Sequence, residues 1–201
     1  SEAEMCGNGA RCFALWAKET TFETLAGTIL AEIGAVKNGA GQVAVRLSDP
    51  FGLRLGVPIN VLGKDIHVHF INTGVPHAVV FVAEIDGIDV KTIGHAIRFH
   101  KEFAPAGTNV NFVEYAGKDA IRIRTYERGV EDETLACGTG TCASAIVSAL
   151  MADDTRAKYG VSVTTQSGEK LRVRFNKDEK AIRDVWFQGK TRIVFEGDLD
   201  A

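Results

Sequence analysis

The sequence predicts an α+β fold with two similar, pseudo-symmetric domains, each a mostly antiparallel sheet wrapped around a central helix. Three observations lead to this prediction: an internal repeat, alternating strand patterns along much of the chain, and a helix-like segment without a polar face. The 201 residues are 45% hydrophobic and 24% charged, so the chain can bury a substantial core in one or two domains.

The repeat is a short cysteine–glycine motif that occurs twice. Residues 5–14 read Met-Cys-Gly-Asn-Gly-Ala-Arg-Cys-Phe-Ala, and residues 136–145 read Ala-Cys-Gly-Thr-Gly-Thr-Cys-Ala-Ser-Ala. Each copy is followed by a helix-like segment and then by a glycine-containing turn, at 24–27 or 165–168, that leads into a strand-like run. Two copies are too few for a solenoid. We therefore expect two related domains that face each other with a site between them.

Hydrophobic periodicity predicts the other elements. Helices are expected over 9–19, 90–103 and 141–151, and the last is apolar or small nearly all round, which is typical of a helix buried on all sides. Glycine-containing breaks at 37–41 and 116–119 predict hairpin turns. Alternating apolar residues predict half-buried strands at Val43, Val45 and Leu47, at Ile66, Val68 and Phe70, at Ile121 and Ile123, and at Ile193 and Phe195.

The repeat divides the chain unequally. We assign residues 1–52 and 189–201 to a first, incomplete domain and residues 53–188 to a second domain. The chain has no initiator Met, and a reactive-looking motif begins close to its first residue. Because a functional loop is rarely placed at a free terminus, we expect the natural protein to have more chain before Ser1.

Charge and composition argue against several function classes. The net charge is −3 and the pI is about 6.0, so no basic excess indicates nucleic acid or an anionic membrane surface as a partner. No apolar run approaches the roughly 18 residues that span a bilayer, and no signal peptide is visible. Four cysteines are too few for a disulfide scaffold.

Cys6 and Cys137 each lie at a glycine-rich turn that opens a predicted helix. The first N–H groups of a helix lack internal partners, so they can hold a substrate carboxylate and favour a thiolate over a thiol. If the two copies face each other, a thiolate can remove a Cα proton while a thiol delivers another to the opposite face. This scheme inverts a stereocentre without a cofactor, and the two thiols titrate as a coupled pair.

The four cysteines could also serve a zinc site or a redox reaction. Structural zinc sites favour two to four residues between paired ligands. Four residues lie between Cys137 and Cys142, which fits this spacing, but five residues lie between Cys6 and Cys12, which does not. Helix formation would also turn Cys12 and Cys142 away from a shared metal, and we interpret both as small core residues. A thiol–disulfide oxidoreductase is a further alternative, although a Cys6–Cys137 disulfide would inactivate an acid–base pair.

Three segments resemble the signatures of the diaminopimelate epimerases: residues 5–12, Glu127-Arg128-Gly129 and residues 136–140. The resemblance extends from residue 1 to the end. It implies two similar α/β domains with the cysteines at their interface. It also implies interconversion of LL- and meso-2,6-diaminopimelate without pyridoxal phosphate, a cytoplasmic protein that serves lysine and peptidoglycan synthesis, and a possible homodimer. The resemblance implies a small-molecule amino-acid substrate and neither nucleic acid nor a membrane as a partner.

The resemblance also implies roles for individual residues. Cys6 matches the proton donor and Cys137 the proton acceptor for one direction of reaction, and His77 and Glu127 match residues that support catalysis beside them. The substrate contacts would come from Gly7, Asn8, Asn109, Glu127, Arg128, Gly138 and Thr139. Val75 stands where the family often has a substrate-contacting Asn, so we leave it out of the binding set. The family's first segment is absent, and we expect little activity from this chain alone.

Each of these positions also has a structural interpretation. His77 could be an ordinary loop histidine, Glu127 and Arg128 an exposed charge pair, and Asn109 the cap of a turn. Elsewhere, His67 and His69 share one strand face without a third metal ligand, so a solvated face is expected, and His95 and His100 are expected at the surface.

Competing functions remain open at the level of the sequence. Proline and hydroxyproline epimerases share the logic of two cysteines but match the surrounding motifs less well. A histidine racemase on the same scaffold is harder to separate, because the distal polar contacts decide specificity. A non-catalytic relative of the fold and a zinc-binding module are alternatives from other classes.

Overall fold

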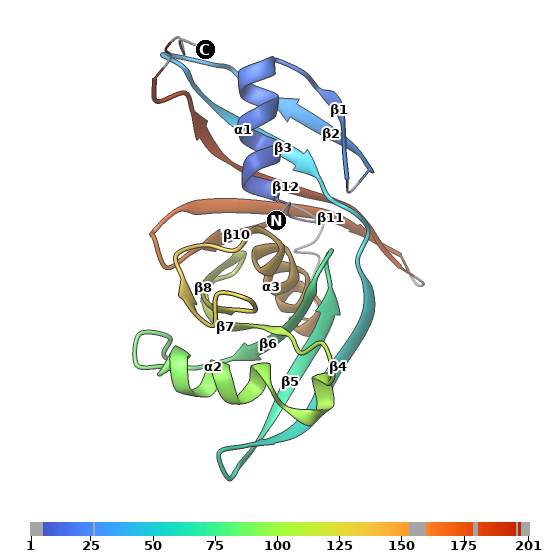
Figure 1. Ribbon diagram of the computed structural model, residues 1–201, viewed down its shortest axis with the longest axis vertical. Helices are drawn as coiled ribbons and strands as arrows, with labels where there is room; N and C mark the ends of the chain where they lie inside the picture. The colour runs from blue at the N-terminus through green and yellow to red at the C-terminus, as the bar shows by residue number, and fades with distance from the viewer. Residues whose placement is uncertain (1–5, 26, 153–159, 179–180, 196, 198–201) are drawn as a thin grey trace.

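The computed structural model describes residues 6–25, 27–152, 160–178, 181–195 and 197. Within them, twelve strands form one sheet in the order β1-β2-β3-β12-β11-β10-β8-β7-β6-β5-β4, with β9 paired to β8 (Figure 1). Only the pairs β10–β8 and β6–β7 are parallel, so the predicted α+β fold with mostly antiparallel pairing is confirmed. Met5, Ala26 and residues 198–201, which the predicted motif, turn and first domain include, lie outside the described residues.

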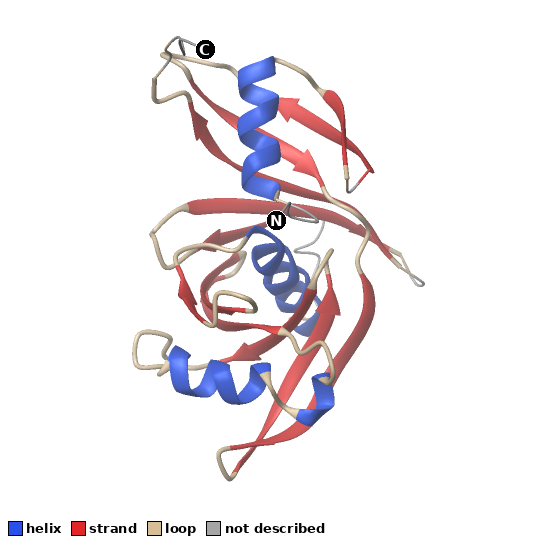
Figure 2. Cartoon of the chain, viewed as in Figure 1, coloured by secondary structure: helices blue, strands red, loops and turns tan. Residues whose placement is uncertain are grey.

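Three α-helices, shown in Figure 2, accompany the described strands. They are α1 (Gly7–Ala17), α2 (Val90–Arg98) and α3 (Gly138–Met151), and a short 3-10 helix, η1 (Lys101–Phe103), follows α2. The strands are β1 (Thr21–Thr24), β2 (Gly27–Ile33), β3 (Ala40–Arg46), β4 (Phe51–Val61), β5 (Lys64–Asn72), β6 (Pro76–Phe81), β7 (Asn109–Gly117), β8 (Ala120–Glu127), β9 (Asp132–Thr134), β10 (Val161–Thr164), β11 (Lys170–Lys177) and β12 (Ile182–Arg192).

Helix α3 forms the centre of the larger part of the molecule. Its residues from Thr139 to Ala149 are buried on every side, as its composition predicts. Figure 1 shows the strands from β4 to β11 curving around α3, whereas α1 lies against the smaller group of strands above it. The core cluster around α3 also contains Ala14 and Leu15 of α1, so one hydrophobic core joins both parts of the sheet.

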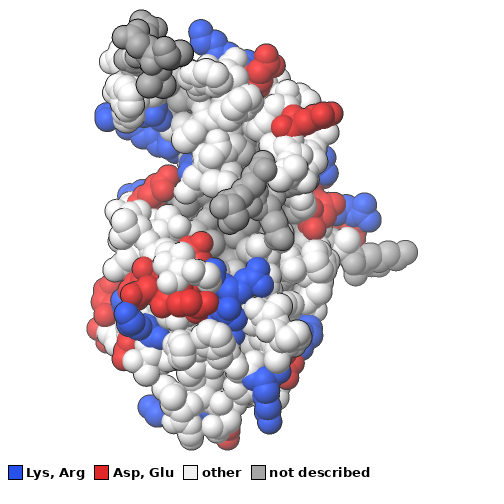
Figure 3. All heavy atoms as spheres, in the orientation of Figure 1, with Lys and Arg blue, Asp and Glu red and all other residues white. Residues whose placement is uncertain are grey.

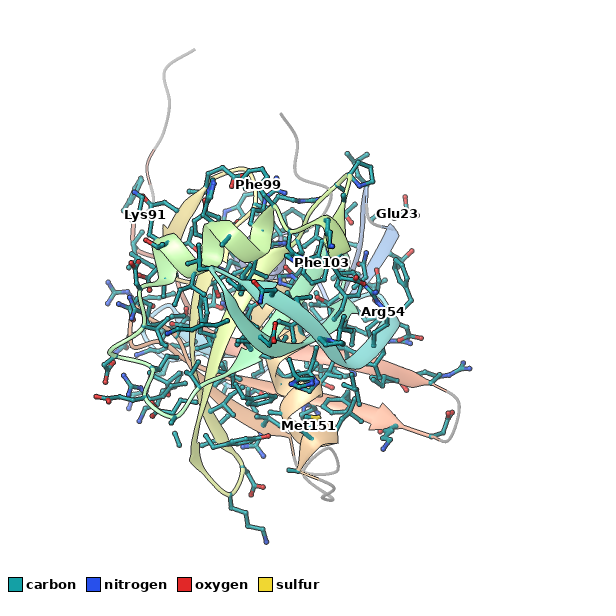
Figure 4. The ribbon with its side chains drawn as sticks, turned by 90° about the horizontal axis from the view of Figure 1, so that it is seen from below. Glu23, Arg54, Lys91, Phe99, Phe103 and Met151 are labelled. Atoms are coloured by element: carbon teal, nitrogen blue, oxygen red, sulfur yellow. The ribbon has the colours of Figure 1, made fainter. Side chains whose placement is uncertain are left out.

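Helix α2 covers the outer face of the curved strands and packs on a second cluster that includes Phe112 and Tyr126. It begins at Asp89, whose carboxylate accepts a hydrogen bond from the Thr92 N–H at 3.0 Å. Figure 4 shows Phe99 and Phe103 beyond the helix end. The predicted helix over 90–103 therefore stops at Arg98, because His100 is extended and its ring accepts from the Glu102 N–H to start η1 instead.

The internal repeat has a counterpart in the sheet. The run α1-β1-β2-β3 and the run α3-β10-β11-β12 have the same order, and their last strands, β3 and β12, pair antiparallel from Arg46↔Trp186 to Ala40↔Arg192. A half-turn about this strand pair therefore relates the two copies. The division into domains at residues 52 and 188 stays a prediction, and both positions fall within strands.

The last predicted strand is wrong in position. Ile193 and Phe195 follow β12, and Phe195 is 84% exposed. The strand actually occupies residues 182–192, where the inward positions include Gly189 and Thr191. These small and polar residues hide the alternation on which the prediction depended.

Two residues have an environment that differs from the predicted one. His69 is buried rather than solvated, because its ring packs edge-on against Phe81 and accepts a hydrogen bond from the Gly56 N–H at 3.3 Å. Cys12 is exposed rather than in the core, because it lies on the outward side of α1, where Trp16 is also exposed. Cys142 is fully buried as predicted.

Charged side chains of both signs are mixed on the face shown in Figure 3. Ion pairs of the described residues include Arg124 with Glu133 and Lys91 of α2 with Asp132. In the described part of the chain, no helix is long and apolar enough to cross a membrane.

Candidate active site

The two cysteine–glycine motifs meet at one pocket of about 220 Å³. Cys6 and Cys137 both line it, each at the residue that precedes the first turn of its helix. The predicted residues Gly7, Asn8, Asn109, Glu127, Arg128, Gly138 and Thr139 line it as well, together with Val75 and Ala136. His77 does not line the pocket and lies behind it. Segments separated by more than a hundred residues thus converge, as the repeat suggested.

Cys6 is the N-cap residue of α1 and has an extended backbone conformation. Its Sγ accepts a hydrogen bond from the Gly9 N–H at 3.3 Å, so the sulfur points toward the positive end of the helix. The first turn of α1 contains no acidic residue that would oppose a negative charge there. This arrangement suits a sulfur that alternates between thiol and thiolate.

Cys137 holds the same position at α3 but is almost fully buried. Burial raises the pKa of its thiol above the ordinary range, and the negative charge of Glu127 raises it further. Contacts from Thr139 and from the backbone N–H groups of Thr139 and Gly140 act in the opposite direction but are weaker. The lowering of a thiol pKa by the helix end, expected from the sequence, is therefore outweighed at Cys137, which favours its thiol form.

A phenylalanine that the sequence did not single out supports both cysteine turns. Phe187 of β12 is completely buried, and a Cβ added at Gly7 would lie 3.0 Å from its ring. A Cβ added at Gly138 would lie 3.3 Å from the same ring. Each turn therefore needs a glycine to approach the ring, which gives both turns a common floor. Arg11 stacks on Phe187, with 4.7 Å from Cζ to the ring centre.

Arg11 also orients one pocket residue. Its Nη2 donates to Asn8 Oδ1 at 2.9 Å and lies 3.4 Å from Glu169 Oε1, which belongs to the other copy of the repeat. Because the Asn8 oxygen is engaged in this way, its amide N–H groups are the end left for a ligand in the pocket.

His77 is fully buried on β6, behind the pocket. Its Nδ1 lies 2.8 Å from Asn111 Oδ1, and its Nε2 lies 3.0 Å from Thr139 Oγ1. Burial lowers the pKa of His77 to about 4, and the positive charge of Arg128 lowers it further, against the effect of Asn111. His77 is therefore neutral near pH 7 and reaches Cys137 only through Thr139.

Asn109 connects the strands that carry the other pocket residues. Its Oδ1 accepts from the Arg128 N–H at 2.8 Å, and its Nδ2 donates to the Pro76 carbonyl at 2.9 Å. These bonds join β7 to the ends of β8 and β6, so they hold neighbouring strands together rather than cap a local turn. Glu127 and Arg128 are half-buried at the pocket and are not a freely exposed pair.

Metal binding finds no support in the arrangement of side chains. Within the described ranges, no three His, Cys, Asp or Glu side chains gather as a metal site. The four cysteines are free thiols.

The fold has counterparts among solved structures. A probable proline racemase from Agrobacterium radiobacter K84 matches with a TM-score of 0.67 and 14% identity over 94% of this chain and 66% of that one. A hydroxyproline epimerase from Agrobacterium vitis matches with a TM-score of 0.57 and 17% identity over 92% of this chain and 62% of that one. The chain thus belongs to the class of α+β proteins that share the fold of these two structures.

Sequence relatives define the family within this class. The profile described as diaminopimelate epimerase matches residues 69–190. The diaminopimelate epimerase of Aquifex aeolicus is 48% identical, with 99% of this chain and 71% of the relative aligned. That of a Hydrogenobaculum species is 45% identical over the same shares. The chain belongs to the diaminopimelate epimerase family and is therefore an isomerase of the type that works without pyridoxal phosphate.

Proposed function

We propose that this protein interconverts LL- and meso-2,6-diaminopimelate by proton transfer at Cα between Cys6 and Cys137. The observation that carries the proposal is the convergence of both cysteines, each at a helix N-terminus, on one small pocket. Membership of the family supports this substrate. The relatives of the proline racemase type share only 14–17% identity and speak for the fold alone.

Diaminopimelate has an amino-acid group at each end, and different pocket residues can bind the different charged groups of the substrate. The N–H groups of Gly7, Asn8, Gly138 and Thr139 open the two helices, and they can hold the carboxylate next to the reacting carbon. The same donors stabilise the enolate-like charge that develops when Cα loses its proton. Arg128 can hold a carboxylate with two parallel hydrogen bonds, and Glu127 provides the opposite charge for an ammonium group.

The proton transfer follows from the two sulfur positions. Cys6 as a thiolate takes the Cα proton while the Cys137 thiol delivers its proton to the opposite face, which leaves Cys6 as a thiol and Cys137 as a thiolate. The raised pKa of Cys137 makes this direction the one that starts from the favoured form of that residue. In the reverse direction, Cys6 is the donor and Cys137 the acceptor, as the family resemblance implies.

A cytoplasmic location, a role in lysine and peptidoglycan synthesis, and a homodimer belong to the same proposal. They follow from the family rather than from the geometry of the pocket. Size-exclusion chromatography with light scattering tests the dimer, and a monomer at working concentrations would contradict that part.

Incubation of the full-length protein with LL-diaminopimelate in deuterated water tests the activity. We expect deuterium at Cα of the meso product, and no exchange with proline, hydroxyproline or histidine. Cys6→Ala and Cys137→Ala should each reduce epimerisation at least about 100-fold, because each face needs its own acid or base. Cys12→Ala, an exposed position outside the pocket, should leave the rate unchanged. Label in another amino acid, or active cysteine variants, would overturn the proposal.

A further inference from the structure

A buried chain of hydrogen bonds leads from the sheet to Cys137 and includes Asn111, to which the proposed reaction assigns no role. Thr125 Oγ1 accepts from Asn111 Nδ2 at 2.8 Å, and Asn111 Oδ1 lies 2.8 Å from His77 Nδ1. His77 Nε2 lies 3.0 Å from Thr139 Oγ1, which lies 3.5 Å from Cys137 Sγ. All five side chains are buried, so a missing link leaves a polar group without a partner at a substantial cost.

The orientation of the Asn111 amide sets the direction of each hydrogen bond in this chain. The Asn111 amide nitrogen faces Thr125, so its oxygen faces His77 and can only accept. The proton of the neutral ring must then lie on Nδ1, which leaves Nε2 without a proton. Nε2 accepts from the Thr139 hydroxyl, and the Thr139 oxygen offers only lone pairs to Cys137. A protonated Cys137 is the partner that completes this arrangement.

The packing of α3 leaves little freedom for another arrangement. A Cβ at Gly140 would lie 2.4 Å from Asn111 Nδ2 and 3.2 Å from His77 Cε1. The chain of hydrogen-bonded side chains therefore lies directly against the backbone of the first turn of α3. The His77 ring and the Asn111 amide are held between this backbone and the strands β6, β7 and β8.

We propose that Asn111 is a positioning residue that holds His77 in its Nδ1–H tautomer, and so keeps Cys137 in the thiol form that donates a proton. The proposal deepens the two-cysteine mechanism and rests on it for its catalytic meaning. The hydroxyl of Thr139 carries one proton, for which His77 Nε2 and a Cys137 thiolate compete. Asn111 decides this competition by keeping Nε2 an acceptor.

The reaction step is balanced within this scheme. When Cys137 gives its proton to Cα, its S–H bond breaks and the sulfur keeps the electron pair, while Cys6 takes the original Cα proton. The Thr139 O–H then turns from His77 Nε2 to the new thiolate. No proton is transferred to or from His77, which keeps its Nδ1 proton and stays neutral throughout.

The charged and titratable groups around this chain are Arg128, which faces His77, and Glu127, Cys142 and Cys6, which face Cys137. Glu127 raises the pKa of Cys137, and Arg128 lowers that of His77. A substitution at Asn111 leaves all four groups in place. The effects of these four groups on Cys137 and His77 are therefore shared by the variant and the wild type.

Asn111→Asp is the most informative variant, because it keeps the shape and changes the charge. A carboxylate beside Nδ1–H favours the doubly protonated ring, whose Nε2–H donates to Thr139 and frees the Thr139 hydroxyl for the sulfur. We expect Cys137 to shift toward thiolate and its alkylation by iodoacetamide at pH 7 to accelerate about tenfold. Mass spectrometry of the peptide that contains Cys137 measures this rate.

Thr125→Val and Thr125→Ser form a matched pair at the far end of the chain. Valine removes the acceptor of Asn111 Nδ2, so the amide can reverse and the tautomer becomes mixed, whereas serine retains the acceptor and should restore the wild-type state. Nitrogen NMR of protein labelled in its histidines reports the tautomer of His77 directly, with His77→Gln to assign its signals.

Three results would support the proposal: His77 protonated on Nδ1 in the wild type, a charged His77 ring with faster Cys137 alkylation in Asn111→Asp, and a mixed tautomer in Thr125→Val but not in Thr125→Ser. Protonation of the wild-type ring on Nε2 would overturn it, and so would identical spectra for the two Thr125 variants. Both of these tests remain available if Asn111→Asp fails to fold. Neither readout needs a substrate. Absence of Cα exchange in the wild type would instead count against the proposed function.

Discussion

Phe187 offers the sharpest test of how the pocket is supported. Its ring is the shared floor under both cysteine turns, and Phe187→Leu removes the planar surface while keeping an apolar side chain. We expect the two turns to lose their fixed relation. A displacement of about 1 Å between acid and base lowers a rate about 100-fold, so we expect kcat to fall by that factor.

The cost in stability has two parts that the structure separates. Replacing a buried phenylalanine by leucine leaves a small void, which destabilises by about 1 kcal/mol when the site relaxes partly. The guanidinium of the buried Arg11 also loses the ring on which it stacks at 4.7 Å, a contact that contributes about 2 kcal/mol when desolvated. Phe187→Leu should therefore lower the free energy of unfolding by about 3 kcal/mol.

Phe175→Leu is the matched control, because Phe175 belongs to the same core cluster but, unlike Phe187, is not the ring that Gly7 and Gly138 approach. It should cost about 1 kcal/mol and leave kcat unchanged. Urea unfolding and the deuterium exchange assay, run on both variants at a temperature where each is folded, measure the two effects. Equal kcat values for the two variants would refute the role of Phe187 as a common floor.

Three further predictions concern charge and packing. The free energy of unfolding should fall by about 3 kcal/mol as the pH drops from 6.5 to 4. The reason is that His77, with a pKa of about 4, stays neutral in the folded protein over most of this range, while the same histidine in the unfolded chain binds a proton. In urea titrations, His77→Gln should remove this contribution to the pH dependence of the unfolding free energy. Gly140→Ala should destabilise by about 1–3 kcal/mol in the same assay, since its Cβ would lie 2.4 Å from Asn111; a more stable variant would contradict this. Glu133→Gln should lower the melting temperature and reduce the free energy of unfolding by about 1–2 kcal/mol, because Arg124 donates to both carboxylate oxygens at 2.7 and 2.8 Å. An unchanged melting temperature would show that the ion pair makes no net contribution to stability.

The sequence contained enough local signal for the repeat, the helices and most pocket residues. The motifs place Cys6 and Cys137 at helix starts because glycine turns and small residues determine the local backbone. The buried helix α3 could be predicted from its composition alone. These features depend on neighbours within a few positions in the chain.

The errors concern residues whose environment is set by distant segments. His69 is buried because a bulged region of β4 supplies its hydrogen-bond donor, Gly56, and no local pattern reports that contact. Strand β12 escaped notice because Gly189 occupies an inward position, where Arg11 needs the space that a side chain would fill. Asn111 was not among the predicted site residues, because its role depends on contacts with His77 and Thr125 from other strands.

The half-turn that relates β3 and β12 has a stereochemical consequence. Any two equivalent groups placed by such an axis approach a common point from opposite directions, so a flat carbanion at that point presents one face to each. A duplicated, single-handed fold thereby treats left- and right-handed versions of a carbon centre almost alike. The small differences between the surroundings of the two cysteines, with Arg11 near one and a neutral His77 behind the other, then decide which hand is the easier starting point.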